Sequence, residues 1–238
     1  MKTHIIAVSC LFILLASISA TLAADCVLVR DGQPAATIVV ADAPDEIPLS
    51  LRPHRDNNIK ERVQLTARYA AEQLQHYIKK ATGATLPIVA ASKAPANGTL
   101  VLVGRSRLVA DNKLPLPETP EGIRLVHFPR GIAVLGEVHT TGQGDARRTI
   151  DRSVHLAAYR LLDELGFRFY FYDDPSDDLG EVIPKTDTVK VTEAMAFDTA
   201  PDFPFRSGFL VGSFAHNDLV VRVNRTGNTT GFYANHTD

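Results

Sequence analysis

The chain has 238 residues, of which 45% are hydrophobic and 22% are charged, and its formal net charge is -2. This is the composition of a globular protein with room for one sizeable core or two small ones. The near-neutral charge argues against a nucleic-acid partner and against a polybasic membrane patch. Tryptophan is absent, which argues mildly against a complete saccharide site built on tryptophan platforms.

The first 23 residues have the pattern of a secretory signal peptide. Lys2 supplies a positive n-region, residues 5–18 are apolar, and Thr21-Leu22-Ala23 offers a cleavage site with small residues at its -3 and -1 positions. The alternative is a membrane anchor, but the run is shorter than the roughly 20 residues of a membrane span. We therefore expect a secreted or periplasmic protein that has no membrane contact after cleavage.

The chain contains two cysteines. Cys10 lies in the signal, so cleavage leaves Cys26 alone and the mature chain without an internal disulfide. Lipid attachment at Cys26 is conceivable, but Asp25 is a poor match for the small residue that such sites require. We expect Cys26 to be unreactive.

After the signal, β-rich runs over 26–30 and 37–40 flank the hairpin signal Asp31-Gly32. Residues 43–56 contain three prolines and predict an irregular surface loop. A long helix is then predicted over residues 61–81. Its apolar face consists of Val63, Ala67, Ala70, Leu74, Tyr77 and Ile78.

The ends of this first helix agree with the helix dipole and with helix capping. Glu61 lies near the predicted start, and Lys79 and Lys80 lie near the end. Gly83 follows as the residue that ends the helix.

The middle of the chain predicts four short strands, over 86–90, 100–104, 122–128 and 131–136. The last two flank Pro129-Arg130-Gly131, and this pattern predicts a hairpin. Residues 105–112 fit a short helix, and residues 140–145 predict a polar, glycine-containing loop.

Residues 149–171 organise the rest of the chain. They predict one helix that runs directly into one strand, with an apolar stripe of Val154, Ala158, Leu161, Leu162 and Leu165. Asp151 is placed in the first turn, and Gly166 as a left-handed cap. Phe167, Phe169 and Phe171 then alternate as in a strand. Final short strands are predicted over 181–183 and 188–192.

This order of elements predicts an α+β fold in which two helices pack on one mixed β-sheet. We expect the domain to span residues 24–197. Residues 198–238 form a junction that includes Pro201-Asp202-Phe203-Pro204-Phe205-Arg206, and they are too few for a domain of normal size.

Four stretches carry a resemblance to a known family: AAEQLQHYIKKATGATLPIV, LVLVGRS, GIAVLGE and HLAAYRLLDELGFRFYFYDDPSDDLGEVIPK. Together they resemble the N-terminal domain of family 67 alpha-glucuronidases. The layout is also similar to the pre-barrel domain of family 20 beta-N-acetylhexosaminidases, as found in large secreted bacterial proteins that carry a glycosidase barrel. The resemblance covers roughly residues 26–206, and the helix-and-strand segment is its most specific part.

The resemblance implies a hexosaminidase domain-2-like module without catalytic residues, followed by the truncated start of a (β/α)₈ barrel. By the same resemblance, Arg206 is a candidate sugar ligand, since its guanidinium can donate to vicinal hydroxyls. The alternative is that Arg206 caps the domain junction through backbone carbonyls. A barrel needs about 250 residues, so the catalytic barrel, and the carbohydrate partner that it would bind, lie outside this chain.

Other polar clusters give weaker signals. The densest acidic cluster is Asp173, Asp174, Asp177, Asp178 and Glu181, and its turn residues indicate a solvated turn more than a cation site. Gly142-Gln143-Gly144, with Arg147 and Arg148 nearby, indicates a flexible connector more than a phosphate site.

The remaining nucleophilic and metal-binding residue types lack supporting patterns. The histidines His127, His139, His155, His216 and His236 have no zinc spacing, and we place His155 at the edge of its helix face. Ser153 and Ser213 have no nucleophile context. We therefore expect no metal, no cofactor and no catalytic residue.

Three functions follow from these observations. The first is a non-catalytic N-terminal accessory domain of a secreted glycoside-hydrolase-like protein that acts in polysaccharide breakdown, and it is the one that the sequence favours. The second is a stand-alone secreted module that binds a carbohydrate or a protein. The third, a small complete hydrolase, lacks a carboxylate pair in a supporting context.

Overall fold

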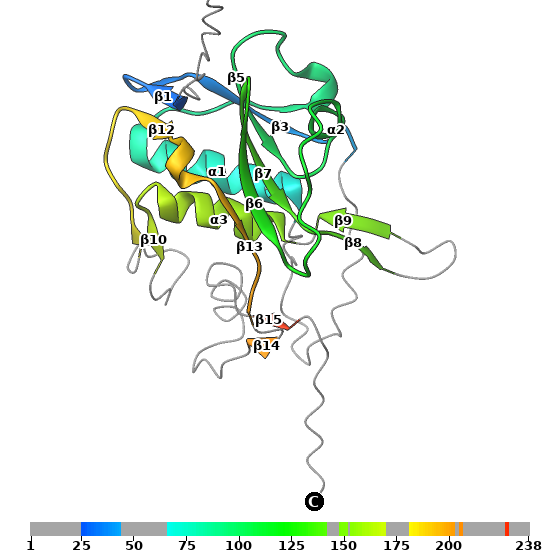
Figure 1. Ribbon diagram of the computed structural model, residues 1–238. Coiled ribbons are helices and arrows are strands. Elements are labelled where there is room, and N and C mark those ends of the chain that lie inside the picture. Colours follow the sequence, from blue (N-terminus) through cyan, green and yellow to red (C-terminus); the bar gives the residue numbers. More distant parts are fainter. Residues whose placement is uncertain are drawn as a thin grey trace, which may run out of the picture.

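The computed structural model describes residues 25–43, 66–141, 148–151, 153–169, 181–202, 205–206 and 227–228. These residues form an α+β fold around a six-stranded mixed sheet with the strand order β13-β6-β7-β5-β3-β4 (Figure 1). Its strands are β3 (Ala36–Val40), β4 (Ile88–Ala90), β5 (Thr99–Val103), β6 (Ile123–Phe128), β7 (Gly131–Gly136) and β13 (Phe197–Thr199). Strands β7, β5, β3 and β4 are parallel, whereas β6 and β13 are added antiparallel.

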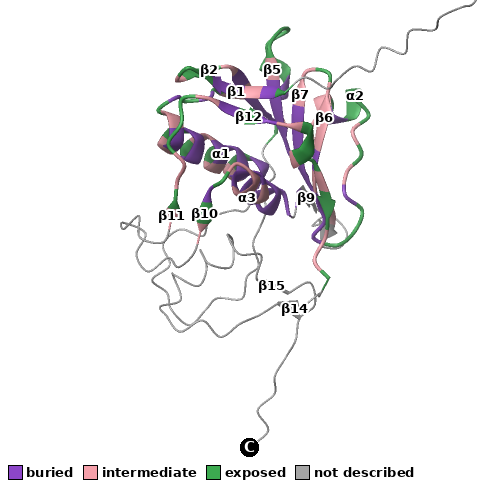
Figure 2. Cartoon of the chain, turned by 60° about the vertical axis from the view of Figure 1, so that its left-hand side comes forward, coloured by how far each residue is buried: buried purple, intermediate pink, exposed green. Residues whose placement is uncertain are grey.

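Helices α1 (Ala67–Thr82) and α3 (Val154–Glu164) pack side by side on one face of this sheet (Figure 1). Strand residues alternate between the two faces. Ile38 and Val40 join the core beneath these helices, whereas Val39 faces a smaller core under α2 (Arg107–Asp111). Figure 2 shows how much of α1 and α3 is buried, and the buried residues of both helices belong to one core with strand residues. The predicted pair of helices on a sheet is therefore present, together with the short third helix.

A second, three-stranded sheet has the order β12-β1-β2. It contains β1 (Cys26–Arg30), β2 (Gln33–Pro34) and β12 (Val189–Val191). Asp31 and Gly32 both have positive φ, at 50° and 71°, as a two-residue type I′ turn requires, so the predicted turn is confirmed. The strand that pairs with β1 is Gln33–Pro34 and not the predicted run over 37–40. The prediction of one sheet is wrong, because the chain leaves this hairpin at Ala35 and enters the other sheet as β3.

Helix α1 begins later than the sequence predicts. The Thr66 side chain accepts a hydrogen bond from the Tyr69 N–H at 3.2 Å and caps the helix, so Glu61 does not lie in its first turn. The predicted end is confirmed: Lys79 and Lys80 lie in the last turn, and Gly83 is left-handed with φ 80°.

The predicted helix over residues 149–165 is wrong at its start. Residues of β9 (Arg148–Asp151) pair with β8 (Val138–Thr141) in an antiparallel hairpin, and α3 begins only at Val154. Asp151 is therefore a strand residue and not part of a first helical turn. The first residues of the predicted loop over 140–145 also belong to β8, while residues 142–147 lie outside the described part.

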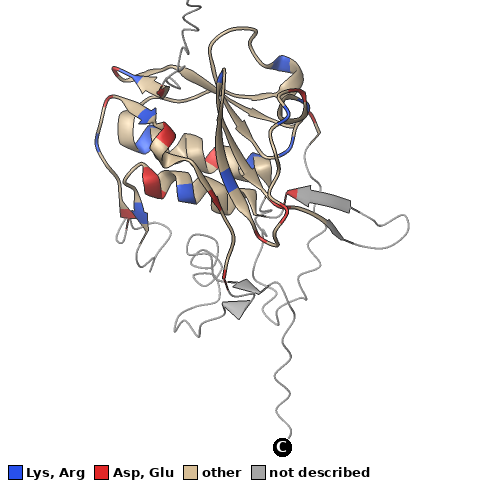
Figure 3. Cartoon of the chain, in the orientation of Figure 1, with Lys and Arg blue, Asp and Glu red and all other residues tan. Residues whose placement is uncertain are grey.

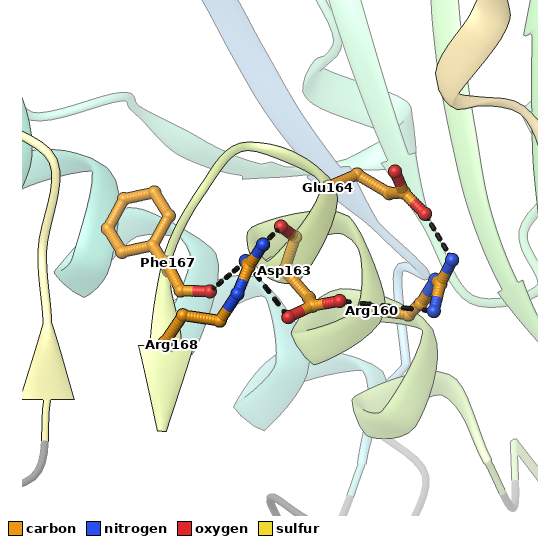
Figure 4. A network of polar contacts seen from close by, with 5 residues as sticks. All are labelled: Arg160, Asp163, Glu164, Phe167 and Arg168. Atoms are coloured by element: carbon orange, nitrogen blue, oxygen red, sulfur yellow. Dashed lines mark hydrogen bonds and ion pairs between the residues drawn. The ribbon is translucent and has the colours of Figure 1, made fainter. Parts of the chain in front are cut away.

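The C-terminal end of α3 has the predicted cap. Gly166 has φ 92°, its N–H donates to the Asp163 carbonyl, and the Phe167 N–H donates to the Leu162 carbonyl, which is a Schellman motif. Figure 4 shows how Arg168 reinforces this turn: its Nη1 donates to the carbonyls of Asp163 and Phe167, at 2.6 and 2.7 Å. The helix thus passes directly into β10 (Arg168–Phe169).

The remaining elements are short. Strand β10 pairs with β11 (Glu181–Val182), and β14 (Phe205–Arg206) pairs with β15 (Gly227–Asn228). Two 3₁₀ turns cover Ala91–Lys93 and Glu193–Met195. Strand β13 ends at Thr199, two residues beyond the predicted domain end at residue 197.

Candidate functional site

The carboxyl ends of the parallel strands lie at one edge of the sheet, which we call the carboxyl edge. It is marked by Val40 of β3, Ala90 of β4, Val103 of β5 and Gly136 of β7. The start of β6 and the end of β13 lie there too, because Ile123 pairs with both Gly136 and Thr199. In open α/β sheets, ligands bind beside this edge.

Buried polar side chains gather at this edge. In the described part of the chain, the buried polar residues are Thr66, Glu121, Glu137, Asp151, Ser153 and His155. Thr66 caps α1, Glu121 precedes β6 and Glu137 follows β7. Asp151 ends β9, Ser153 precedes α3, and His155 lies in its first turn. A buried polar group is costly unless it is hydrogen-bonded, so each must be explained by its contacts.

Asp151 is 1% exposed and lies where the ends of β9 and β5 meet the start of α1. Its two carboxylate oxygens lie 3.1 and 3.2 Å from the Arg105 N–H, and the Arg105 Nε lies 3.8 Å from Oδ2. The Gly104 backbone comes so close that an added Cβ would lie 2.8 Å from Asp151 Oδ2 and 2.6 Å from Ala67 Cβ. Asp151 therefore fastens β9 to the residue that follows Gly104 at the end of β5, close to the start of α1.

Ser153 and Glu137 fasten the other side of the edge. The Ser153 hydroxyl donates to the Gly122 carbonyl at 2.6 Å and accepts from the Glu137 N–H at 2.9 Å. The Glu137 side chain accepts from the Glu121 N–H at 2.6 Å. These bonds tie the start of α3 to β6 and β7, and they give Ser153 a structural role, in line with its lack of a nucleophile context.

Among the described residues, two hollows can be placed at the carboxyl edge. The first, the α1 hollow, has a volume of about 330 Å³ and is lined by Val40, Ala41, Asp42, Ala43, Ala67, Arg68, Ala90 and Asp151. At its rim, the Asp42 carboxylate accepts a hydrogen bond from the Ser92 N–H at 2.7 Å. Hydrogen bonds from Ser92 lower the pKa of Asp42, so this carboxylate stays ionised.

The second hollow, the β13 groove, has a volume of about 470 Å³. It is lined by Pro115, Leu116, Pro117, Glu118, Thr119, Gly122, Arg124, Asp198, Thr199 and Ala200. Arg124 of β6 lies opposite Asp198 of β13, and its Nη2 donates to Asp198 Oδ2 at 2.5 Å. The groove thus joins charged, hydroxyl and proline side chains between the 114–120 loop and the last strand of the sheet.

Several predicted site residues fall outside this description. Arg206 is part of β14, where it pairs with Gly227, but its side chain is not described. The four aspartates at 173–178 and the segment Gly142-Gln143-Gly144 with Arg147 lie outside the described residues, as do His216, His236 and Ser213. The Arg148 side chain is likewise outside the description, although its backbone belongs to β9.

Glu181, the last member of the acidic cluster, is not in a solvated turn. Its side chain is 4% exposed and accepts hydrogen bonds from the Tyr77 hydroxyl at 2.7 Å and the Lys80 Nζ at 2.8 Å. This corrects the prediction for Glu181. The reason is that the β10–β11 hairpin returns to α1, whose Lys80 neutralises the carboxylate.

Three of the histidines can be placed. His127 Nε2 lies 3.1 Å from the Thr192 carbonyl, and His139 Nδ1 lies 3.7 Å from Glu137 Oε1. His155 is buried in the first turn of α3, and this burial is compatible with the predicted position at the edge of the helix face. Among the described residues, no three His, Cys, Asp or Glu side chains gather as metal ligands would.

Cys26 is a buried thiol in β1, 5% exposed, and burial raises its pKa to about 12. A lipid-modified cysteine must project from the folded domain, whereas this side chain lies in the core. The burial of Cys26 therefore argues against lipid attachment and explains the expected lack of reactivity.

Comparison with known proteins gives no assignment, because no protein-family model and no curated protein matches this chain. Within the described segments, no helix is both long and apolar enough to span a membrane. Figure 3 shows acidic and basic residues interspersed along the described helices, strands and loops. The candidate site therefore rests on geometry: the carboxyl edge with its two hollows.

The sequence did not single out Arg124, Glu137 or Asp198, and it assigned Asp151 to the wrong element. Arg124 and Asp198 are 74 positions apart and meet only because β13 pairs with β6. A weak local signal did exist for Glu137, a charged residue directly after the apolar strand of 131–136.

Proposed function

We propose that this chain is the non-catalytic N-terminal accessory domain of a secreted glycoside-hydrolase-like protein, and that a catalytic barrel follows it in the complete protein. The proposal starts from the resemblance of residues 26–206 to the N-terminal domain of alpha-glucuronidases. The α+β fold is compatible with such a module. The domain would support the barrel and shape one side of its entrance.

One structural observation carries the non-catalytic part of the proposal. Three buried carboxylates of the described residues hold the fold together. Asp151 accepts a hydrogen bond from the Arg105 N–H, and Glu137 accepts one from the Glu121 N–H. Glu181 accepts hydrogen bonds from Tyr77 and Lys80. Glycoside hydrolysis instead needs two carboxylates that face each other across a substrate, at about 5 to 10 Å. Carboxylates used as backbone acceptors support a scaffold role.

The position of the chain exit supports the accessory role. Thr199 and Ala200 line the β13 groove at the carboxyl edge, so the polypeptide leaves the sheet beside this groove. A following domain would begin there. In that setting we propose Arg206 as a sugar ligand at the start of the barrel, an assignment that rests on the resemblance alone.

Hydrolysis assays test this proposal. Purified residues 24–238 are incubated with aryl glycosides, aldobiouronic acids and xylan, and we expect no released sugar above the buffer control. Hydrolysis that is lost when a carboxylate within residues 24–238 is changed to its amide would overturn the proposal.

The gene offers an independent test. The DNA is sequenced across and beyond the codon for Asp238, and we expect a coding stretch for a barrel-sized domain of about 250 residues. In a protein that includes this stretch, Arg206→Ala should raise KM for the glycoside, whereas Arg168→Ala, at the surface of the accessory domain, should leave KM unchanged.

A stand-alone binding module is the second candidate. The observation that favours it is the β13 groove, whose volume of about 470 Å³ falls in the range of small-molecule sites. A clean terminator after Asp238, with no barrel-coding stretch, would favour this second function.

A further inference from the structure

We propose that the β13 groove binds a neutral, polyhydroxylated ligand, that is, one or two sugar units of a saccharide chain. This deepens the proposed function and rests on it for the source of the ligand. The argument itself comes from the walls, floor and chemistry of the groove, all formed by described residues.

The first wall is a loop held in place without any ligand. The Gly122 N–H donates to the Thr119 carbonyl at 2.8 Å, and a Cβ on Gly122 would lie 2.8 Å from that carbonyl oxygen and 2.9 Å from Pro117 Cβ. Glu121 adopts φ 56° and is buried. Prolines 115 and 117 restrict the backbone further. A preformed wall loses little conformational freedom when a ligand binds.

The floor is Arg124. Its Nη1 donates to the Pro115 carbonyl at 2.7 Å and to the Leu116 carbonyl at 3.4 Å, and its Nη2 donates to Asp198. The side chain is 19% exposed. Within the described residues it thus uses three of the five N–H donors of a guanidinium. The guanidinium, which lines the groove, is held in position by these bonds, and they leave two of its N–H donors.

The second wall is the final strand of the sheet. In the described part, β13 neighbours β6 alone, so Asp198 and Thr199 stand at an open side of the groove. The Asp198 side chain is 62% exposed despite its bond to Arg124. One carboxylate oxygen is therefore engaged by Arg124, while the rest of the group is accessible to a ligand.

These groups fit hydroxyl groups better than other ligand chemistries. The carboxylates of Asp198 and Glu118 can accept O–H bonds, Arg124 can donate, and the hydroxyls of Thr119 and Thr199 can do either. Proline rings offer an apolar surface for the C–H face of a sugar. Because the groove has two carboxylates and one guanidinium, electrostatic repulsion disfavours the binding of phosphate or sulfate. An apolar ligand is disfavoured because its binding would remove water from these charged groups.

The test is an NMR titration of ¹⁵N-labelled residues 24–238 with cellobiose, xylobiose and chitobiose, and with inorganic phosphate as the anionic comparison. We expect at least one disaccharide to shift the amide signals of Gly122, Arg124, Thr199 and Ala200, with a dissociation constant in the millimolar range. Phosphate should not shift them. Asp198→Asn should weaken binding at least about tenfold, as expected for the loss of a charged acceptor.

The matched control is Asp187→Asn, an exposed aspartate in the turn beside Asp31-Gly32 and not part of the groove. It should leave the dissociation constant unchanged. Melting temperatures of both variants check that the fold is kept, and Glu118→Gln serves as a second groove variant because Glu118 is exposed and holds no element of the fold.

The proposal is overturned if no disaccharide shifts the groove amides of the folded protein, or if the shifts map to another surface. It is also overturned if phosphate binds the groove more tightly than the sugars, or if neither Asp198→Asn nor Glu118→Gln weakens binding. These outcomes are separate from the hydrolysis assays. Sugar binding together with carboxylate-dependent hydrolysis would refute the accessory role and leave the groove assignment standing.

Discussion

Gly104 shows how strongly one residue can determine the carboxyl edge. It has φ 69°, and it follows the buried strand β5 at the point where α1 and β9 meet. A side chain at this position would have two costs. The backbone would be strained in the left-handed region, and the Cβ would overlap atoms of Ala67 and Asp151. The two costs can be separated, because Gly32 has φ 71° and no atom within 4 Å of the position that a Cβ would occupy.

We predict that Gly32→Ala lowers the free energy of unfolding by about 1 kcal/mol, the cost of the left-handed backbone alone. Gly104→Ala should lower it by about 1–3 kcal/mol more, because the added methyl overlaps Ala67 Cβ and Asp151 Oδ2. Urea denaturation of both variants measures the difference. Equal losses for the two variants would show that the close packing around Gly104 is relaxed in solution.

Cys26 provides a second prediction for a single residue. Burial raises the pKa of its thiol from 9.0 to about 12, so at pH 8 the native protein holds it as the unreactive thiol. An aromatic disulfide reagent should therefore label residues 24–238 slowly at pH 8, and rapidly in concentrated guanidinium chloride. The Cys26→Ala variant supplies the blank. Labelling of the native protein at the rate of a free thiol would contradict the burial of Cys26.

The same shift in pKa makes stability depend on pH. The unfolded thiol ionises near pH 9 and the folded one near pH 12, so the contribution of Cys26 is complete below pH 9. It is lost as the pH rises through 12. Between these values the free energy of unfolding should fall more steeply for the wild-type chain than for Cys26→Ala.

Among the elements, the β10–β11 strand pair is attached to α1 by one ion pair, between Glu181 and Lys80. Glu181 accepts from both Tyr77 and Lys80. Around it, the Tyr77 ring contacts Phe169 edge to face at 4.9 Å between ring centroids, and Tyr159 contacts Phe169 at 5.3 Å. The hairpin is therefore attached to both long helices by aromatic packing and by one carboxylate.

We predict that Glu181→Ala lowers the free energy of unfolding by about 2 kcal/mol or more, because it leaves Lys80 partly buried without this carboxylate. The comparison is Glu72→Ala, a change on α1, the helix that also carries Lys80. Glu72 pairs with Arg68 at 2.6 Å, but both side chains are about half exposed, so the loss should stay below about 0.5 kcal/mol. Thermal unfolding of both variants tests the contrast, and similar losses would argue against a special role for Glu181.

The sequence predicted those elements whose signal is local. The apolar run at 100–104, the hairpin around Pro129-Arg130-Gly131 and the glycine cap at Gly166 agree with β5, β6–β7 and the end of α3. Each depends on neighbouring residues, through hydrophobic continuity or a required positive φ. Propensity and pattern therefore suffice for the centre of the sheet.

Elements defined by distant partners were mispredicted or missed. Thr149 and Ile150 continue a helical pattern into Val154, yet they pair with Thr140 and His139 as a strand. Strand β13 was missed because its side chains, Phe197, Asp198 and Thr199, show no apolar run, and its pairing with β6 is what defines it. The candidate site was unpredictable for the same reason, since Arg124 and Asp198 belong to this pairing.

For the whole molecule, the described fold restricts where the chain can be processed. Strand β1 begins at Cys26, and Cys26, Leu28 and Val29 are buried in the main core. Cleavage after Ala23 would leave this strand intact, whereas cleavage beyond Cys26 would remove a core residue that pairs with Val191 of β12. The proposed signal peptide and the described fold are therefore compatible only if cleavage falls before β1.

We predict that the exported protein begins at Ala24. Intact-mass measurement and N-terminal sequencing of the periplasmic or culture fraction should both identify this end, since Thr21-Leu22-Ala23 places small residues where a signal peptidase needs them. Leu14→Arg should block export, because a charge in the centre of the apolar run opposes membrane insertion. The variant Lys113→Arg, on the folded domain, should be exported normally. A protein that keeps Met1 and stays with the membranes would refute the signal peptide and favour a membrane anchor.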